Sequence, residues 1–235
     1  MRLLTWNARR GRYLAKMPSL DHFDADVLVV PEIAAPAHES AQVLWFGDNP
    51  HQGLAVAARK PYALRRLPLA KHAPKFVVPV AVDGPQPFLL FAVWTLGLKP
   101  LPYVRAACAA VDLYAQLFRK GPVVMMGDFN SNAIWDGEHP PDASHSALVA
   151  RLRGHGLVSA YHHFHGVAHG REPKAGHTFY LYGHEEKSFH LDYCFVPKAW
   201  ACRIQNVSIG GYHDWKAHSD HRPVLVDLQD AHRAS

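Results

Sequence analysis

Short apolar runs recur along the chain and are typical of buried β-strands. Each run is bounded by proline, glycine or polar residues, which interrupt regular structure. The pattern predicts strands at 2–7, 27–31, 53–59, 62–68, 75–82, 88–94 and 122–127. It also predicts four later strands, around 157–161, 178–182, 191–196 and 223–228.

Two segments carry apolar residues at helical spacing instead. Residues 102–119 have Pro102 near their start, as helices often do. Residues 145–156 predict a second helix that ends at Gly154 or Gly156. Helices are too few for strict βαβ alternation, which favours an α/β sandwich of mixed sheets over a Rossmann or barrel fold. No repeat or linker divides residues 1–235, so we expect a single domain.

Composition limits the class of protein and of partner. Apolar residues make up 49% of the chain, which indicates a globular fold. Lys and Arg number 25 against 20 for Asp and Glu, and this basic excess suits a polyanion such as nucleic acid. Three cysteines without a CxxC spacing favour a reducing compartment. No signal peptide or membrane span is recognisable, so we expect a cytoplasmic monomer that does not act at a membrane.

One strand ends in a pair of polar groups. The run 123–127 leads into Asp128 and Asn130, and residues two apart on extended chain face the same side. Ligands of α/β sheets collect at such strand ends. A simple turn is the alternative interpretation, because Asp and Asn also bond their own backbone.

The same pattern recurs in four other segments, whose polar residues are Asn7, Glu32, Asp192 and the pair Asp220–His221. One such group could be a cap, but five segments together indicate a site. Carboxylate and amide oxygens without cysteine favour Mg²⁺ or Mn²⁺, which serve phosphate chemistry. An Asp–His pair adds a way to hold an imidazole in one tautomer.

These segments resemble the signature blocks of the endonuclease/exonuclease/phosphatase superfamily. The blocks read LLTWN, PE, GDFNSN, HLDYCFV and SDHRP, stand in the order of the family, and span residues 3–224. The resemblance implies a four-layer α/β/β/α sandwich of the DNase I-like type. It also implies in-line attack of water on phosphorus.

For the metal, the resemblance implies that Asn7 and Glu32 bind Mg²⁺ or Mn²⁺. Asp220 would be a second metal ligand or an outer-shell group. The residue after Ala8 is an acid in many exonuclease III-type members, but here Arg9 and Arg10 follow, which favours contact with phosphate.

For catalysis, the resemblance implies that Asp128 orients and deprotonates the attacking water, while Asn130 positions that water and the phosphate. His221 would bind phosphoryl oxygens with Asp192 as its partner. The chain departs from the family after residue 94, where a His or Tyr usually contacts the phosphate. Thr95 or Leu96 stands there.

Apolar residues near the last blocks bear on the substrate. In abasic-site enzymes of the superfamily, aromatic and leucine side chains wall the pocket for the base-less sugar, and Phe179, Phe189 and Leu191 stand at those places. The alternative is that they are core residues.

The histidine-rich segment GLVSAYHHFHG resembles the family motif Leu-x-Asp-x-Phe-Arg, with Ser159, Tyr161 and His162 in the last three named places. Four histidines at 162, 163, 165 and 169 also allow a zinc interpretation. Their spacing lacks a tetrahedral ligand pattern, so we favour a structural role.

Three functions follow from these patterns. The first is a metal-dependent nuclease that hydrolyses phosphodiester bonds, in DNA rather than RNA, with activity at abasic sites as an option. The second is a phosphomonoesterase or lipid-headgroup phosphodiesterase of the same superfamily. A non-catalytic binding protein is the third, and the intact set of polar residues argues against it.

Overall fold

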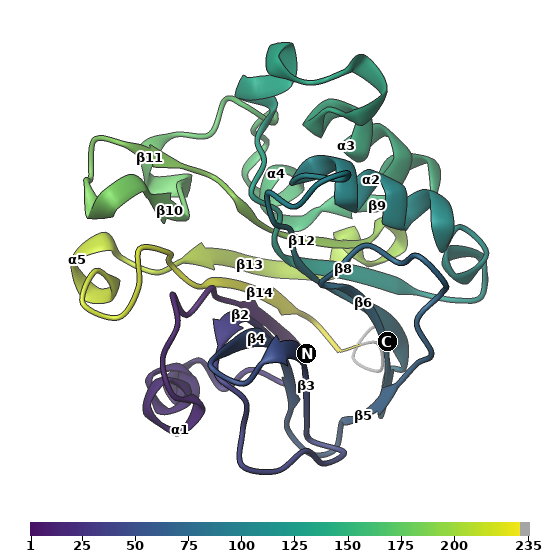
Figure 1. Cartoon of the computed structure of the whole chain (residues 1–235), viewed down its shortest axis with the longest axis vertical. Helices are drawn as coiled ribbons and strands as arrows, with labels where there is room; N and C mark the ends of the chain where they lie inside the picture. The colour runs from purple at the N-terminus through teal and green to yellow at the C-terminus, as the bar shows by residue number, and fades with distance from the viewer. Residues whose placement is uncertain (231–235) are drawn as a thin grey trace.

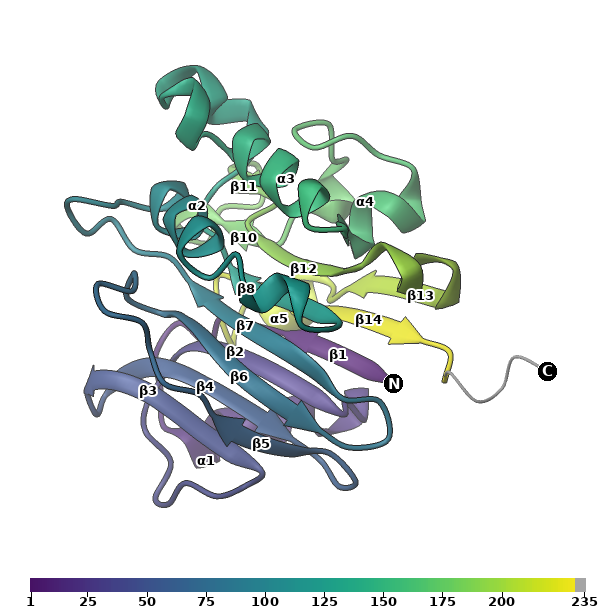
Figure 2. The ribbon, with the colours of Figure 1, turned by 90° about the vertical axis from the view of Figure 1, so that its right-hand side faces the viewer.

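Two mixed β-sheets packed face to face form the centre of the molecule, and helices cover their outer sides (Figure 1, Figure 2). The computed structural model describes residues 1–230. This arrangement confirms the four-layer α/β/β/α sandwich. Among these residues, none of the helices has the length and apolar character that a membrane-spanning segment requires.

Each of the two main sheets has six strands. The first contains, in spatial order, β13 (Ile204–Ile209), β14 (Val224–Leu228), β1 (Arg2–Thr5), β2 (Val27–Ile33), β4 (Gln52–Ala58) and β3 (Val43–Asn49). The second contains β5 (Ala63–Arg66), β6 (Val77–Asp83), β7 (Phe88–Trp94), β8 (Val123–Asp128), β12 (Asp192–Pro197) and β9 (Leu157–Ser159). A separate hairpin pairs β10 (Phe179–Tyr180) with β11 (Ser188–Phe189).

Helices are short and lie outside the sheets. They are α1 (Tyr13–Lys16), α2 (Val104–Leu113), α3 (His145–Gly154), α4 (Ala160–His165) and α5 (Tyr212–Trp215). Turns of 3₁₀-helix add Met17–Phe23, Leu117–Arg119, Ala133–Glu138, Pro141–Ala143, Lys174–Gly176, Leu181–Gly183 and Lys198–Arg203. In Figure 1, α2, α3 and α4 lie on the outer side of the second sheet, and α1 lies on the side of the first.

Three of the predicted elements differ from the structure. The helix expected over 102–119 is regular only as α2, and the chain then tightens into a 3₁₀ turn that stacks Phe118 on Phe91, with ring centroids 5.0 Å apart. The strand expected near 157–161 ends at Ser159, where α4 begins. The strand expected near 178–182 is reduced to the two residues of β10.

Alternating residues of the central strands serve different layers. Val124 and Met126 of β8 lie in the core between the sheets, whereas Val123 and Met125 face α2 and α3. In the first sheet Leu4 packs on the opposite side to its neighbour Leu3, beneath the helical turns of the N-terminal region. Both faces of each sheet are therefore apolar, which explains why these strands read as continuous apolar runs.

Register places two acidic residues directly opposite each other. Strand β8 ends at Asp128, and the antiparallel strand β12 begins at Asp192, with the two residues paired across the ladder. In the other sheet the segment after β1 continues beside the parallel strand β2, since Ala8 N donates to Pro31 O at 2.9 Å. The ends of four strands thus lie at one edge of the sandwich.

Gly127 permits the close approach that places Asp128 there. Its φ is +143°, and a Cβ atom at this position would lie 1.9 Å from the carbonyl oxygen of Val93 on the neighbouring strand. Only glycine avoids both the clash and the unfavourable φ. The residue before the candidate catalytic carboxylate is therefore fixed by packing.

We expect Gly127→Ala to lower the free energy of unfolding by about 3 kcal/mol, because it combines overpacking with backbone strain. Urea titration measures this change. Gly121→Ala is the matched control, since nothing lies within 4 Å of a Cβ at that position, and its effect should stay within about 0.5 kcal/mol. Equal effects of the two substitutions would contradict the packing argument.

Buried histidines lie between the helices and the second sheet. His145 at the start of α3 and His190 just before β12 are 1% and 0% exposed. Burial lowers the pKa of His145 to about 4 and that of His190 to about 3. Both imidazoles are therefore neutral at pH 7.

This burial predicts an acid-sensitive fold. Between pH 6.5 and pH 4 the unfolded chain binds protons at these positions and the folded protein does not, so stability falls as the pH is lowered. Each histidine contributes a slope of about 1.4 kcal/mol per pH unit in this window. Urea titrations at pH 6.5, 5.5 and 4.5 should show that slope reduced by about this amount in His145→Asn. An unchanged slope would mean that His145 is not held neutral.

Candidate active site

Asn7 connects the two sheets at their shared edge. Its side chain is buried at the end of β1, and Nδ2 donates to Glu32 Oε1 at 3.1 Å and to Asp128 Oδ2 at 2.9 Å. Its Oδ1 accepts a hydrogen bond from the backbone N–H of Arg9 at 2.9 Å. One amide therefore holds carboxylates from both sheets, as the sequence pattern predicted for residues at strand ends.

Glu32 lies at an irregularity of β2 and not beyond the end of the strand. Its φ is +58°, and the pairing with β4 shifts between Pro31 and Ile33. This bulge turns the carboxylate toward Asn7, while Glu32 Oε2 accepts a hydrogen bond from Gln52 Nε2 at 2.9 Å. Sequence reasoning missed Gln52, because nothing in an apolar strand marks its first residue as part of a site.

Asp128 is fully buried and receives three hydrogen bonds. Oδ1 accepts from the backbone N–H of Asn130, and Oδ2 accepts from the side-chain amides of Asn7 and Asn130, each at 2.9 Å. The first bond is the turn geometry that was the alternative interpretation of this segment. The turn is present, and it also brings Asn130, with φ +44°, back over the carboxylate, so a turn and a site are compatible here.

His221 lies between two carboxylates. Its Nδ1 is 2.8 Å from Asp192 Oδ2, and its Nε2 is 3.9 Å from Asp128 Oδ2. Burial by itself lowers the pKa of His221, but the two carboxylates outweigh it and raise that pKa above its ordinary value. The pKa of Asp128 is raised to about 7, chiefly by burial and further by Asp192, although His221 acts in the opposite direction.

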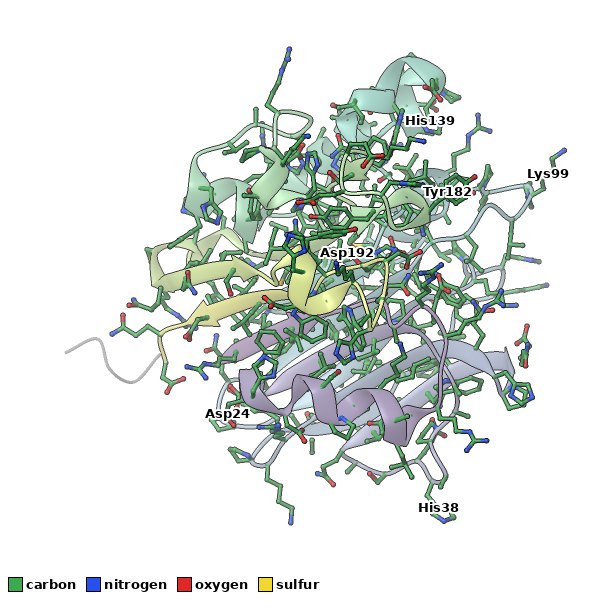
Figure 3. All side chains as sticks on the ribbon, turned by 90° about the vertical axis from the view of Figure 1, so that its left-hand side faces the viewer. Asp24, His38, Lys99, His139, Tyr182 and Asp192 are labelled. Carbon is green, nitrogen blue, oxygen red and sulfur yellow. The ribbon has the colours of Figure 1, made fainter. Side chains whose placement is uncertain are left out.

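The hydroxyl of Thr178 holds the backbone at Asp192 in place. The N–H of Asp192 and that of Leu191 both donate to Thr178 Oγ1 at 3.0 Å. Oδ1 of Asp192 is buried and has no hydrogen-bond partner in residues 1–230. In the view of Figure 3 the buried Asp192 lies near the middle of the molecule. The residue opens β12, whereas the sequence suggested a place inside the strand.

Basic residues lie at the rim of this site. Arg9 Nε is 3.3 Å from Asp220 Oδ2, and Arg9 and Arg10 both have positive φ angles, of 48° and 68°. Ser219 Oγ donates to the carbonyl of Asn7, so the segment bearing Asp220 is attached to the end of β1. A cavity of about 180 Å³ beside Asp220 is lined by Arg9, Tyr180, Gly183, Tyr212, Lys216, Ser219 and Arg222.

Aromatic side chains stand beside His221. Phe179 is half-buried, with its ring centroid 4.7 Å from that of His221, and Phe189 lies opposite it in the β10–β11 hairpin. The ring centroids of Phe189 and Trp135 are 4.9 Å apart. The sequence alone did not indicate Trp135. Leu191 is 3% exposed and is a core residue. Phe179 therefore lies at the candidate site with Phe189 paired to it in the hairpin, and the burial of Leu191 favours the alternative of a core residue.

Thr95 stands at the position where the family usually has a His or Tyr that contacts the phosphate, and it bonds the neighbouring loop. Thr95 is buried, its hydroxyl donates to the carbonyl of Phe129, and its own carbonyl accepts from Asn130 Nδ2 at 3.0 Å. The indole N–H of Trp94 is buried without a partner in the described chain, and its ring packs on Phe76. Lys99 lies well away from Asp192 in Figure 3. Thr95 thus positions the side chain of Asn130 through its carbonyl.

The oxygen-rich side of the site fits a hard cation. Glu32 and Asp128 converge on one amide, and the buried Oδ1 of Asp192 lacks a donor. Asp128, Asp192 and His221 also present ligand atoms within 4.8 Å of one another. Asn7 would offer Oδ1 to a metal, the atom that now accepts from Arg9 N–H. The group found among the described residues contains two carboxylates and an imidazole, without a cysteine, and carboxylate oxygens are the ligands that Mg²⁺ and Mn²⁺ prefer.

A second group with metal-binding residue types is His162, His169 and Glu172, whose ligand atoms also lie within 4.8 Å of one another. The rings of His162 and His169 are stacked, with centroids 3.6 Å apart and 12° between their planes. Parallel rings cannot both direct their in-plane lone pairs at one ion. The geometry is that of a hydrogen-bonded cluster, in line with the structural role expected for this segment.

Comparisons with solved structures agree with this fold. A 3'-5' exonuclease from Neisseria meningitidis is 18% identical, with a TM-score of 0.68 over 98% of this chain and 100% of that one. A second Neisseria structure, described as a 3' phosphatase bound to a product DNA hairpin, is 17% identical, with a TM-score of 0.68 over 98% of this chain and 100% of that one. An AP endonuclease from Archaeoglobus fulgidus is 16% identical, with a TM-score of 0.66 over 98% of this chain and 100% of that one.

Comparison of sequences shows the family. No curated protein sequence matches the chain. The model of the endonuclease/exonuclease/phosphatase family, in contrast, matches residues 4–221, which include the segments that bring Asn7, Glu32, Asp128, Asp192 and His221 together. On this match, and with the fold and the site in agreement with it, the chain belongs to the endonuclease/exonuclease/phosphatase family.

Proposed function

We propose that the protein hydrolyses phosphodiester bonds in DNA with the help of a divalent metal ion. The observation that carries the proposal is the position of Asp128, a fully buried carboxylate fixed by two amides with an imidazole 3.9 Å away. A turn residue needs no such surroundings. In-line attack of water on phosphorus needs a fixed proton acceptor and a nearby positive charge.

Asp128 orients the attacking water and takes its proton. A carboxylate offers about four acceptor positions, and three donors occupy Asp128. One position is left for the water. Burial raises the pKa of Asp128 above that of an exposed carboxylate, which makes its ionised form a stronger base. Asn130 binds the Asp128 carboxylate through its side-chain amide and would position the phosphate beside it.

His221 stabilises the charge that develops on the phosphoryl oxygens. Asp192 holds its Nδ1 and favours the protonated ring, so that Nε2–H can donate toward the substrate. Phe179 packs on the ring and limits its rotation. The protonated imidazole of His221 is the group of this pair that would offer a charged donor to the phosphate, and Thr95 stands where the family usually has a His or Tyr.

Mg²⁺ or Mn²⁺ would be held by Glu32 with Asn7, and Asp220 would act at the edge of the site. The ion, when bound, neutralises charge on the phosphate. Gln52 keeps the Glu32 carboxylate in place through its hydrogen bond.

The basic rim supports a nucleic-acid substrate. Arg9 is 56% exposed although it pairs with Asp220, and Arg10 is exposed. Such side chains contact phosphates without reading sequence. One of the Neisseria structures is described as bound to a product DNA hairpin, which supports DNA over RNA as the substrate. Phe179, Phe189 and Trp135 would contact an extruded sugar or base, as at an abasic site.

The free thiols Cys108, Cys194 and Cys202 support a cytoplasmic location.

A substrate panel tests this proposal. We expect wild-type protein with Mg²⁺ or Mn²⁺ to cleave plasmid, single-stranded DNA or an abasic-site duplex, and to lose this activity in EDTA. Asp128→Asn keeps the shape of the side chain and removes the proton acceptor, so its rate should fall by about 10²–10⁴-fold. Asp112→Asn is the matched control, because Asp112 is an exposed partner of Arg151, and its rate should equal that of wild type.

Three other results are informative in the same panel. Full activity in EDTA would contradict the metal requirement. An Asp128→Asn rate within a few-fold of wild type would reduce Asp128 to a turn residue. Faster turnover of a 3'-phosphate end or of a phosphorylated lipid headgroup than of any DNA strand would replace the nuclease with a phosphomonoesterase or lipid-headgroup phosphodiesterase.

A further inference from the structure

The loop that carries Asn130 is held from behind by a buried amide. Asn132 is 2% exposed, and its Nδ2 donates to the carbonyl of His190 at 3.1 Å and to Glu172 Oε2 at 3.3 Å. Its Oδ1 accepts from the backbone N–H of Ile134 at 3.0 Å. Asn132 therefore fixes both the exit of the loop and the backbone two residues before Asp192.

Glu172 is the charged end of this connection. Its side chain is only 3% exposed, and Oε1 accepts from His162 Nε2 at 2.8 Å and from the N–H of Gly170 at 3.0 Å. Burial favours the neutral acid, but these donors outweigh it and keep the pKa of Glu172 well below its ordinary value. A carboxylate that stays ionised inside the protein needs every one of these donors.

His162 completes the chain of contacts. Its Nδ1 is 2.7 Å from Ser159 Oγ, so both ring nitrogens are bonded. Ser159 and His162 stand where the family motif has Asp and Arg. In this chain a hydroxyl and an imidazole occupy those places, and the negative charge comes from Glu172 in a later loop.

We propose that Glu172 is a positioning residue for the candidate active site and acts through Asn132 on the loop 129–132. This inference rests on the proposed function for its effect on rate. Asn130 bonds Asp128 through both its backbone and its side chain, so a shift of the loop moves the proton acceptor itself. Misplacement by a fraction of an ångström is enough to slow such a reaction.

Other contacts limit the size of the effect. Ser131 Oγ bonds His145 Nδ1 at 2.9 Å, and Tyr193 OH donates to the carbonyl of Ser131 at 3.0 Å. These contacts hold the middle of the loop when the bond from Asn132 to Glu172 is lost. Loss of that bond should therefore reduce turnover without abolishing the fold.

Glu172→Gln tests the inference, with Glu186→Gln as the control, since Glu186 is 65% exposed. We expect kcat for DNA cleavage to fall roughly 10–100-fold, as for other groups that orient catalytic ones, while KM changes less than about two-fold. Amide hydrogen exchange in peptides covering 129–135 should become faster, whereas exchange in 77–83 should not change. A lower melting temperature with unchanged kcat and unchanged exchange would make Glu172 merely structural and overturn the inference.

A reversed pair provides a rescue. Asn132→Asp puts an acceptor opposite the Glu172 carboxylate, so kcat should fall further than in Glu172→Gln. Combining the two substitutions restores a donor at 172 and an acceptor at 132, and should recover at least several-fold of the kcat lost in Asn132→Asp. A double variant no faster than Asn132→Asp would overturn the inference. If wild type cleaves no phosphoester, the proposed function fails, and the exchange measurement still decides whether Glu172 holds the loop.

Discussion

Two buried carboxylates face each other across one antiparallel pair of strands, and the rest of the site is arranged around them. Asp128 and Asp192 are paired in register and both are fully buried. Like charges so placed repel each other and have lost their hydration. The imidazole of His221 lies between them and offsets part of this cost. The orphaned oxygen of Asp192 and the raised pKa of Asp128 show that the compensation within the described chain is incomplete. That deficit is the physical reason for expecting a cation.

The backbone around these groups is shaped to serve them. Glu32 and Asn130 have positive φ angles although neither is glycine, and so do Arg9 and Arg10. Such conformations cost of order 1–3 kcal/mol each and persist only where the surroundings enforce them. Here they turn side chains from two sheets toward one point, and Gly127 supplies the close contact between β7 and β8 that completes the arrangement. The sheets are apolar, and these four strained residues lie near the strand ends that form the site. Positive φ angles also occur elsewhere, at Asp24, His72, Phe76, Tyr103 and Tyr182.

Much of this could be predicted from the sequence, because polar residues at the ends of apolar strands are easily recognised. This pattern indicates Asn7, Asp128, Asp192 and His221, whose side chains the structure brings together, and the same apolar runs predict the mixed-sheet fold. The sequence prediction omits strands β3 and β13, which lie at the edges of the first sheet. Strand β13 is interrupted by polar residues and shows no apolar run, whereas β3 has the short run Val43–Phe46 before the turn-forming residues Gly47, Asp48 and Asn49.

The supporting residues could not be predicted in this way. Gln52, Asn132, Trp135 and Glu172 come from a strand start and from loops, where no periodicity marks a side chain that points inward. Leu191 stays open between the two roles that its place in the motif allowed. Its side chain is 3% exposed, which favours a core residue over a pocket wall. Which side of a short irregular segment faces substrate is decided by tertiary contacts that a single sequence does not reveal.

Calorimetric titration of Mn²⁺ into metal-free protein, without substrate, tests the central claim most directly. The account holds that the carboxylates at the shared edge of the sheets form a cation site with Glu32 as a ligand. It predicts saturable binding to wild type and a large loss of affinity in Glu32→Gln, with Glu186→Gln binding as wild type does. Absence of binding to wild type, or equal binding by Glu32→Gln, would contradict it.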